Sequence, residues 1–301
     1  MSEPETNVLA AISDGLVAAA EKAGASIMTV DARRRYPASG VAWTENAIVT
    51  CDHIIEREDD ITVRLASGEP RAARLAGRDP GSDLAVLTVD GGALTPAERG
   101  GPAKVGQLVL ALGRPEPSIM ASLGVVSSIG GAWQTATGST VEGYIRTDTT
   151  FYPGFSGGPL VDALGRVMGV NSSRLGRGAG LTLPAASVDA IVQALLKSGR
   201  VRRGYLGIAT QPVPIPAALA AKLPQPQERG LMIMSVEPAS PADAAGLMVG
   251  DILVAFGAAQ VTDHRDLQRQ LGAAEVGKAV TLAILHGGEP RSLSVTVGER
   301  E

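Results

Sequence analysis

One serine lies in a stretch of the chain whose composition suits a nucleophile. Ser156 follows Gly154 and Phe155 and precedes two further glycines, and residues of this kind favour a tight turn over a helix or strand. Such a turn exposes a hydroxyl and leaves neighbouring backbone N–H groups without partners, as a serine nucleophile with an oxyanion hole requires. An ordinary glycine-rich loop between two strands is the alternative interpretation.

A serine nucleophile needs a general base, which near neutral pH is usually a histidine. Of the three histidines, only His53 shares a β-rich region with Ser156, at the end of an apolar strand. Asp83, directly before another apolar strand, is the candidate carboxylate that would orient the imidazole. Taken singly, His53 could be structural, and Asp83, like Asp79, could cap a turn or strand. The order His, Asp, Ser along the chain is that of chymotrypsin-type double barrels.

The elements around these residues are mostly short strands. Apolar residues at helical spacing predict a helix that Gly24 ends, followed by a strand over 26–30. From Gly40 onward, apolar runs bounded by Gly, Pro, Asp or Ser are typical of all-β barrels or sandwiches. The runs are 47–51, 61–65, 84–89, 108–112, 123–129, 144–145, 167–170 and 181–183.

A helix after this run of strands marks a domain boundary. Ser187 is its expected N-cap and Gly199 its end, which divides the chain into residues 1–198, with a helical segment at 1–24, and residues 199–301. In the second part, residues 211–227 hold five prolines and are expected to form a loop-rich insertion with one helical turn near 217–222. Strands are expected at 231–236, 252–256, 279–286 and 292–297, with a short helix after Ser240 and a helix over 263–271.

Composition restricts the class of protein. Of the 301 residues, 45% are hydrophobic, enough for a sizeable core, and the net charge of -4 argues against nucleic acid as a main partner. A single cysteine excludes an intrachain disulfide framework. No signal peptide and no run of 18 apolar residues is visible, so the sequence as written predicts a cytoplasmic protein without a membrane span.

Five ordered blocks of the chain resemble the HtrA (Deg) family of trypsin-like serine proteases. The histidine block is SGV at 39–41 followed by IVTCDHII at 48–55, and the aspartate block is SDLAVL at 82–87. The serine block is RTD at 146–148 running into PGFSGGPL at 153–160. GAGLTLP at 178–184 is similar to the strand that lines the family's substrate cleft, and RGYLGI at 203–208 looks like the opening of its C-terminal PDZ module.

The resemblance implies a mostly β fold, in which a chymotrypsin-like double β-barrel is followed by a small α/β PDZ domain. It implies Ser156 as nucleophile, His53 as general base and Asp83 as its orienting partner, with an oxyanion hole formed by the N–H groups of Gly154 and Ser156. The substrate pocket would involve Thr150, Phe151, Gly180, Leu181 and Thr182, and peptide binding by the PDZ module would involve Tyr205, Leu206, Gly207 and Ile208. Because no acid is present at Thr150 or Phe151, we expect cleavage after small or medium apolar residues.

The sequence departs from the family at four places. Phe155 replaces the asparagine that usually precedes the serine, and Asp52 places a second carboxylate beside His53. The loop over 172–177 is shorter than the family's regulatory loop. The aromatic N-terminal segment used for trimer packing is not evident, so the family's trimer is only a possible homo-oligomer here.

These features favour an ATP-independent serine endopeptidase that cleaves unfolded or damaged proteins and recognises protein C-terminal tails. No P-loop is present and no ligand spacing suggests a metal, so neither cofactor nor metal is expected. Phe155 and Asp52 keep a second hypothesis open, a protease-fold chaperone or scaffold that binds polypeptides without cutting them. A metalloenzyme, or Cys51 as nucleophile, is a weaker alternative, and the family resemblance makes a periplasmic location the alternative to the cytoplasm.

Overall fold

A computed structural model describes residues 7–91, 94–134, 140–176, 180–201, 204–271 and 276–299. The chain divides into two compact units, Met1–Val201 and Arg202–Glu301. No helix in the described ranges is both long and apolar enough to cross a membrane.

The first unit begins with the helix expected from the sequence. Helix α1 (Val8–Gly24) is capped by Asn7, whose side chain accepts hydrogen bonds from the N–H groups of Leu9 and Ala10. Ala19 and Ala23 are buried against the core of the first unit. The chain then enters the first strand two residues beyond the cap, so the helix leads directly into the barrel.

The first barrel contains the candidate general base. Its six antiparallel strands close in the order β1-β2-β3-β6-β5-β4. A single 3₁₀ turn, η1 (Asp52–Ile54), follows β3. The strands are β1 (Ile27–Asp31), β2 (Ala38–Ala42), β3 (Ala47–Cys51), β4 (Ile61–Arg64), β5 (Pro70–Asp79) and β6 (Leu84–Val89).

The second barrel contains the candidate nucleophile, in the connection that precedes β12. Its six strands close in the order β11-β14-β13-β12-β7-β8. They are β7 (Leu108–Gly113), β8 (Met120–Gly130), β11 (Tyr144–Thr147), β12 (Pro159–Asp162), β13 (Val167–Ser172) and β14 (Leu181–Pro184), and the strands β9 (Trp133–Gln134) and β10 (Thr140–Val141) pair separately. The predicted double β-barrel is confirmed.

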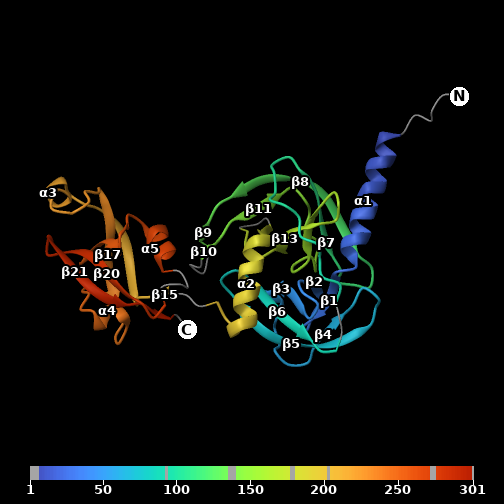
Figure 1. Cartoon of the computed structure of the whole chain (residues 1–301), viewed down its shortest axis with the longest axis horizontal. Helices are drawn as coiled ribbons and strands as arrows, with labels where there is room; N and C mark the ends of the chain where they lie inside the picture. Colours follow the sequence, from blue (N-terminus) through green and yellow to red (C-terminus); the bar gives the residue numbers. More distant parts are fainter. Residues whose placement is uncertain are drawn as a thin grey trace. The chain divides into compact units, whose positions relative to one another are not determined.

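Helix α2 (Ala185–Ser198) contacts strands of both barrels, β5 and β6 of the first and β13 and β14 of the second (Figure 1). The prediction of Ser187 as its N-cap is wrong, because Pro184 holds that position and Ser187 lies inside the first turn, where its hydroxyl donates to the carbonyl of Glu142. A proline needs no N–H partner and its fixed φ suits a helix start. Gly199, with φ of 72°, is the predicted C-terminal end.

The second unit is a small sheet with short helices, as predicted. The sheet order is β16-β17-β18-β20-β21, with β19 paired to β18 and a separate pair β15-β22. Its helices are α3 (Ala217–Ala220), α4 (Pro241–Ala244) and α5 (His264–Gln270), and its strands are β15 (Gly204–Tyr205), β16 (Ile208–Pro214), β17 (Arg229–Val236), β18 (Ile252–Phe256), β19 (Ala259–Gln260), β20 (Ala279–His286), β21 (Glu289–Thr296) and β22 (Gly298–Glu299). The prediction of a loop from residue 211 is wrong, because β16 continues through Pro214 as an edge strand, where proline is tolerated.

Candidate functional site

The pairing of two strands brings His53 and Asp83 together. Strand β3 pairs with β6 so that Cys51 lies opposite Leu84, which places the residues just after β3 beside the residue just before β6. The Nδ1 atom of His53 lies 2.9 and 2.8 Å from the two carboxylate oxygens of Asp83, and the His53 backbone N–H donates to Oδ1 at 3.0 Å. His53 lies in the 3₁₀ turn η1 and not on the strand end that the sequence suggested.

Asp83 is held as a buried carboxylate with several donors. Its side chain is inaccessible to solvent, and its φ of 56° is unusual for a residue other than glycine. The hydroxyl of Ser172 donates to Oδ2 at 2.5 Å, in addition to the bonds from His53. Sequence reasoning missed Ser172, since nothing in the sequence indicates a contact between residues 89 positions apart. The arrangement suits an acceptor-only, ionised carboxylate.

The second carboxylate, Asp52, has another partner. Its Oδ1 accepts a hydrogen bond from Nε of Arg78 at 2.6 Å, and Arg78 also pairs with Glu58 at 2.9 Å. The hydrogen bond that Arg78 donates to Asp52 is the largest cause of the raised pKa of the Arg78 guanidinium. In the described part of the chain, the Asp52 carboxylate makes no hydrogen bond with His53. Asp52 and His53 both lie in η1.

Ser156 lies in the loop between β11 and β12, six per cent exposed. Its hydroxyl pairs with that of Ser173 at 2.9 Å, and the Ser173 N–H donates to it at 3.3 Å. Among the hydrogen bonds of residues 7–91 and 140–176, none joins Ser156 to His53. Since Ser172 binds Asp83 and the next residue binds Ser156, the end of β13 links two of the three candidate catalytic residues. Ser173 is a second residue that sequence reasoning missed.

Two successive turns leave two N–H groups of this loop free. The Phe155 N–H donates to the Tyr152 carbonyl at 3.0 Å, and the Gly158 N–H donates to the Phe155 carbonyl at 2.9 Å. Each turn has a glycine with positive φ at its third position, Gly154 at 87° and Gly157 at 83°, the pattern of type II turns. Within the described residues, the N–H groups of Gly154 and Ser156 donate to no protein atom. These are the two donors that the resemblance assigns to an oxyanion hole.

Ser39 fixes the peptide unit that follows Gly154. Its hydroxyl donates to the Gly154 carbonyl at 2.7 Å and accepts from the Arg114 N–H at 2.7 Å. The Ser39 N–H donates to the Ser156 carbonyl at 3.3 Å. The first barrel therefore holds the serine loop of the second barrel through backbone groups on both sides of Phe155.

The ring of Phe155 packs among apolar side chains in the second barrel. The residue is fully buried, and its ring lies edge-on to that of Tyr152, with centroids 5.4 Å apart. Its neighbours in the core of the second barrel are Val109, Ala111, Val126, Ile145, Leu160 and Met168. Phe155, which replaces the asparagine usual in the family, is thus part of the core of the second barrel.

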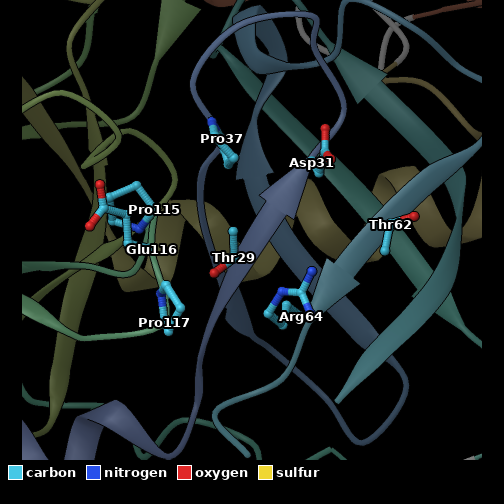
Figure 2. A pocket seen from close by; sticks show the side chains of 8 residues that line it. All are labelled: Thr29, Asp31, Pro37, Thr62, Arg64, Pro115, Glu116 and Pro117. Atoms are coloured by element: carbon cyan, nitrogen blue, oxygen red, sulfur yellow. The ribbon is translucent and has the colours of Figure 1, made fainter. Parts of the chain in front are cut away.

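A surface pocket of about 120 Å³ lies beside the residues that back Gly154 (Figure 2). Pro37 and Pro115 line it, and a Cβ added to Gly154 would collide with Pro115 and the Pro37 carbonyl. The other lining residues are Thr29, Asp31, Thr62, Arg64, Glu116 and Pro117. None of the three candidate catalytic residues lines this pocket, so it is separate from the candidate active site.

The predicted substrate-pocket residues differ in how far they are exposed to solvent and in which residues they contact. Phe151 is half-buried, and its ring lies where a side chain at Gly180 would be, so these two residues are in contact. Thr150 is exposed and its N–H donates to the Ser122 hydroxyl at 2.9 Å. Leu181 and Thr182 are buried, and the Thr182 hydroxyl donates to the Asn171 side chain at 2.7 Å. The structure does not describe residues 178 and 179 of the motif at 178–184 or residue 177 of the loop over 172–177.

Among the described residues, Cys51, His53 and Asp83 place possible metal-ligand atoms within 4.8 Å of one another. Burial, and to a lesser extent the charge of Asp83, raises the pKa of the Cys51 thiol well above its ordinary value. The thiol therefore stays protonated and lies 3.3 Å from the Asn171 carbonyl, to which it donates. A neutral thiol is a poor ligand and a poor nucleophile, so its chemistry does not fit a metal site.

In the second unit, the loop Tyr205–Ile208 presents a row of backbone donors. The carbonyls of Leu206 and Gly207 accept from the N–H groups of Ala242 and Glu237, each at 2.8 Å. Because C=O and N–H lie on opposite sides of a trans peptide, the N–H groups of Gly207 and Ile208 then point the other way. Gly207 has a φ of 81°, and Leu206 is buried. The backbone of Tyr205 pairs with Gly298 of β22.

Comparison with known proteins agrees with this architecture. Residues 38–170 match the trypsin-like peptidase domain and residues 204–297 match the PDZ domain. A probable periplasmic serine endoprotease, DegP-like, of Halomonas elongata is 34% identical over 277 residues, 88% of this chain and 57% of that protein. A protein of the same description from Pseudomonas putida is 32% identical over 265 residues, 85% of this chain and 54% of its own length. The chain thus spans a little over half the length of these curated relatives.

Solved structures match nearly the whole chain. The HtrA-type protease AlgW with a decapeptide superposes with a TM-score of 0.80 at 26% identity, covering 95% of this chain and 99% of that one. A serine endoprotease from Yersinia pestis superposes with a TM-score of 0.79 at 27% identity, covering 95% and 98%. With two six-stranded barrels, a PDZ unit and these relatives, the chain belongs to the HtrA (DegP-like) family of trypsin-like serine proteases with a C-terminal PDZ domain.

Proposed function

We propose that the chain is a serine endopeptidase in which Ser156, His53 and Asp83 act as nucleophile, general base and orienting carboxylate. The observation that carries this proposal is the Asp83–His53 pair at 2.8 Å, together with the N–H groups of Gly154 and Ser156, which have no acceptor among the described residues. Asp83 accepts from Nδ1, so the other ring nitrogen, Nε2, is the one available to take a proton.

In the proposed reaction, the Ser156 hydroxyl turns from Ser173 toward His53. As Oγ attacks the substrate carbonyl, its proton passes to Nε2 of His53, and Asp83 stabilises the imidazolium. The N–H groups of Gly154 and Ser156 receive the negative oxygen of the tetrahedral intermediate. Each such donor contributes about 3–4 kcal/mol of transition-state stabilisation. His53 then returns the proton to the leaving amine, and water completes the hydrolysis in the second half of the cycle.

Labelling by a fluorophosphonate tests the proposal directly. We expect the wild-type chain to be labelled at Ser156 and to cleave unfolded casein, and Ser156→Ala to lose both properties while keeping the wild-type unfolding curve. Asp83→Asn should retain the fold and lose most of the rate, because it would hold the wrong imidazole tautomer. A folded wild-type chain that is neither labelled nor active would refute the assignment.

A second candidate function is a protease-fold scaffold that binds polypeptides without cutting them. The observation that favours it is the pairing of the Ser156 hydroxyl with Ser173, which leaves the nucleophile without a hydrogen bond to His53 in the described residues. The two functions separate in the same experiment. A scaffold would suppress aggregation of an unfolded protein equally well in wild type and Ser156→Ala, with no labelling in either.

We propose that the enzyme cleaves after small or medium apolar residues such as Val, Ala or Leu. Phe151 contacts Gly180 and no acid is found at Thr150 or Phe151, so a positively charged side chain would find no partner at these positions. Digestion of a peptide library measures the preference. Rapid cleavage after Lys or Arg with poor cleavage after Val would contradict it.

The PDZ unit is proposed to bind the C-termini of unfolded or damaged polypeptides. The outward N–H groups of Gly207 and Ile208 suit a terminal carboxylate, and the edge strand β16 suits an added peptide strand. The related AlgW protease has been solved with peptides. Binding of a peptide with a free carboxylate, and loss of binding when that carboxylate is amidated, would support the assignment.

The compartment and the oligomeric state are also proposals. The relatives named above are described as periplasmic, and we propose the same compartment, which cell fractionation tests. A homo-oligomer, a trimer by family resemblance, stays a prediction that light scattering on the purified chain checks.

A further inference from the structure

Strand β16 is at the edge of its sheet, and the hydrogen bonds of β17 show which residues of β16 direct their N–H and C=O groups outward. Strand β17 lies between β16 and β18. Ile233 of β17 donates to the Asp251 carbonyl at 2.8 Å and accepts from the Gly250 N–H at 2.9 Å, both on the side of β18. The N–H and C=O of one residue in an antiparallel ladder point to the same side. Thr210, which pairs with Ile233, therefore directs its N–H and C=O away from β17, toward the free edge.

A side-chain contact independently supports this orientation. Nε2 of His264, the first residue of α5, lies 2.8 Å from the Thr210 carbonyl and donates to it. The contact comes from outside the sheet, so the carbonyl points outward. A carbonyl has two lone pairs, which leaves Thr210 able to accept a second donor from an added strand.

Alternation along the strand then identifies the other outward residues. The pairing of β16 with β17 is regular from Thr210 to Pro214, so Pro212 and Pro214 present the same edge as Thr210. The Ile208 N–H points outward as well, because the Gly207 carbonyl in the same peptide unit is bonded inward to Glu237. The edge thus offers N–H donors at Ile208 and Thr210, while proline supplies none at 212 and 214.

We propose that Pro212 and Pro214 limit the peptide site of the PDZ unit to the last three or four residues of a polypeptide chain. This inference rests on the proposed carboxylate site at Leu206–Ile208. A terminal residue held there pairs with Ile208, and the residue two before it pairs with Thr210. The residue four before the terminus lies opposite Pro212, which cannot donate to it and whose ring occupies the place of the missing N–H. Affinity is therefore set by the chain end itself and not by the preceding segment.

The test measures how the dissociation constant depends on peptide length in the full chain. A library of random ten-residue peptides with free carboxylates supplies the tightest binder, which is then shortened from its N-terminus to four residues. For the wild type, the dissociation constants of the four- and ten-residue forms should agree within about twofold. Pro212→Ala restores an N–H on the edge, so the ten-residue form should bind about two- to tenfold more tightly than the four-residue form. Pro226→Ala, in an exposed loop, is the matched control and should keep the wild-type ratio.

The outcomes separate this inference from the function on which it rests. The quantity compared is the dissociation constant of the four-residue peptide divided by that of the ten-residue peptide. A value of ten or more in the wild type, or the same value in Pro212→Ala as in the wild type, would overturn the length limit while leaving the carboxylate site intact. Equal binding of the amidated four-residue peptide, or no binder in the library, would overturn both. A ratio near one in wild type and Pro226→Ala that rises only in Pro212→Ala establishes the limit.

Discussion

Phe155 is expected to hold the oxyanion loop in place, and Phe155→Ala tests this. The ring is fully buried in the core of the second barrel, and the residue's own N–H and C=O close the two turns that expose the Gly154 and Ser156 donors. Removing a buried phenylalanine ring costs about 3–5 kcal/mol of unfolding free energy. The unfolding free energy of a domain is about 5–15 kcal/mol, so the variant should still fold, with a lower unfolding free energy than the wild type.

The loss of reactivity should exceed the loss expected from destabilisation alone. With a cavity in place of the ring, the Phe155 peptide units can rotate, and the Ser156 N–H loses its fixed direction. Loss of one oxyanion donor costs about 10²–10³ in rate, so we expect the fluorophosphonate labelling rate of Phe155→Ala to fall by about 10- to 1000-fold at a temperature where the protein is folded. Circular dichroism and denaturant unfolding establish that condition.

Two control variants separate loop geometry from general destabilisation. Leu160→Ala removes another fully buried side chain of the same core, at a cost of about 2–5 kcal/mol, but not a loop residue. Phe256→Ala removes a buried ring from the second unit. Both should retain labelling within about threefold of wild type while folded. A folded Phe155→Ala that is labelled as fast as Leu160→Ala would refute the anchoring role.

Two further predictions concern the neighbours of the triad. Ser172→Ala removes a donor from the buried Asp83 carboxylate, a hydrogen bond worth about 1.5–3 kcal/mol. The carboxylate is then held less firmly against His53, so we expect the fluorophosphonate labelling rate to fall; an unchanged rate in the folded variant would contradict this positioning role. Because burial raises the pKa of Cys51, the folded state disfavours the thiolate, so the unfolding free energy should fall as the pH rises above about 8.5, the thiol pKa of the unfolded chain. Cys51→Ala should lack this component in denaturant titrations at pH 7 and 9.5, and parallel pH dependence of the two proteins would count against it.

The sequence predicted many strands from their apolar runs, including 47–51 and 123–129, and it missed the strands Ala38–Ala42, Pro70–Asp79 and Pro159–Asp162. All five residues of Ala47–Cys51 are buried, as the apolar run, interrupted only by Thr50, indicated. Strand β5 was missed because Pro70–Asp79 has arginines every three or four residues among alanine, leucine and glycine, without the period of two that marks a strand, and is only partly buried. The end of β16 was missed because proline usually breaks a strand, a rule that an exposed edge relaxes.

At the candidate site, motif residues could be named but their supporting contacts could not. His53, Asp83 and Ser156 lie in recognisable blocks, and the structure places His53 against Asp83. Ser172 binds Asp83 from the other barrel, and that contact depends on how the two barrels pack and not on any local pattern. The packing of Phe155 likewise depends on side chains from five strands of the second barrel. The sequence alone could therefore not predict that this ring is buried.

Both proposed binding sites expose backbone donors by the same physical device. At Phe155–Ser156 and at Leu206–Ile208, carbonyl groups are bonded into the protein, and the trans geometry of the peptide then directs the attached N–H groups outward. A glycine with positive φ begins or continues each loop, and neighbouring atoms fill the space that a side chain would need, Pro115 at Gly154 and Ser240 at Gly207. The donors are therefore oriented before any ligand arrives, so no ordering cost is set against the binding of an oxyanion or a terminal carboxylate.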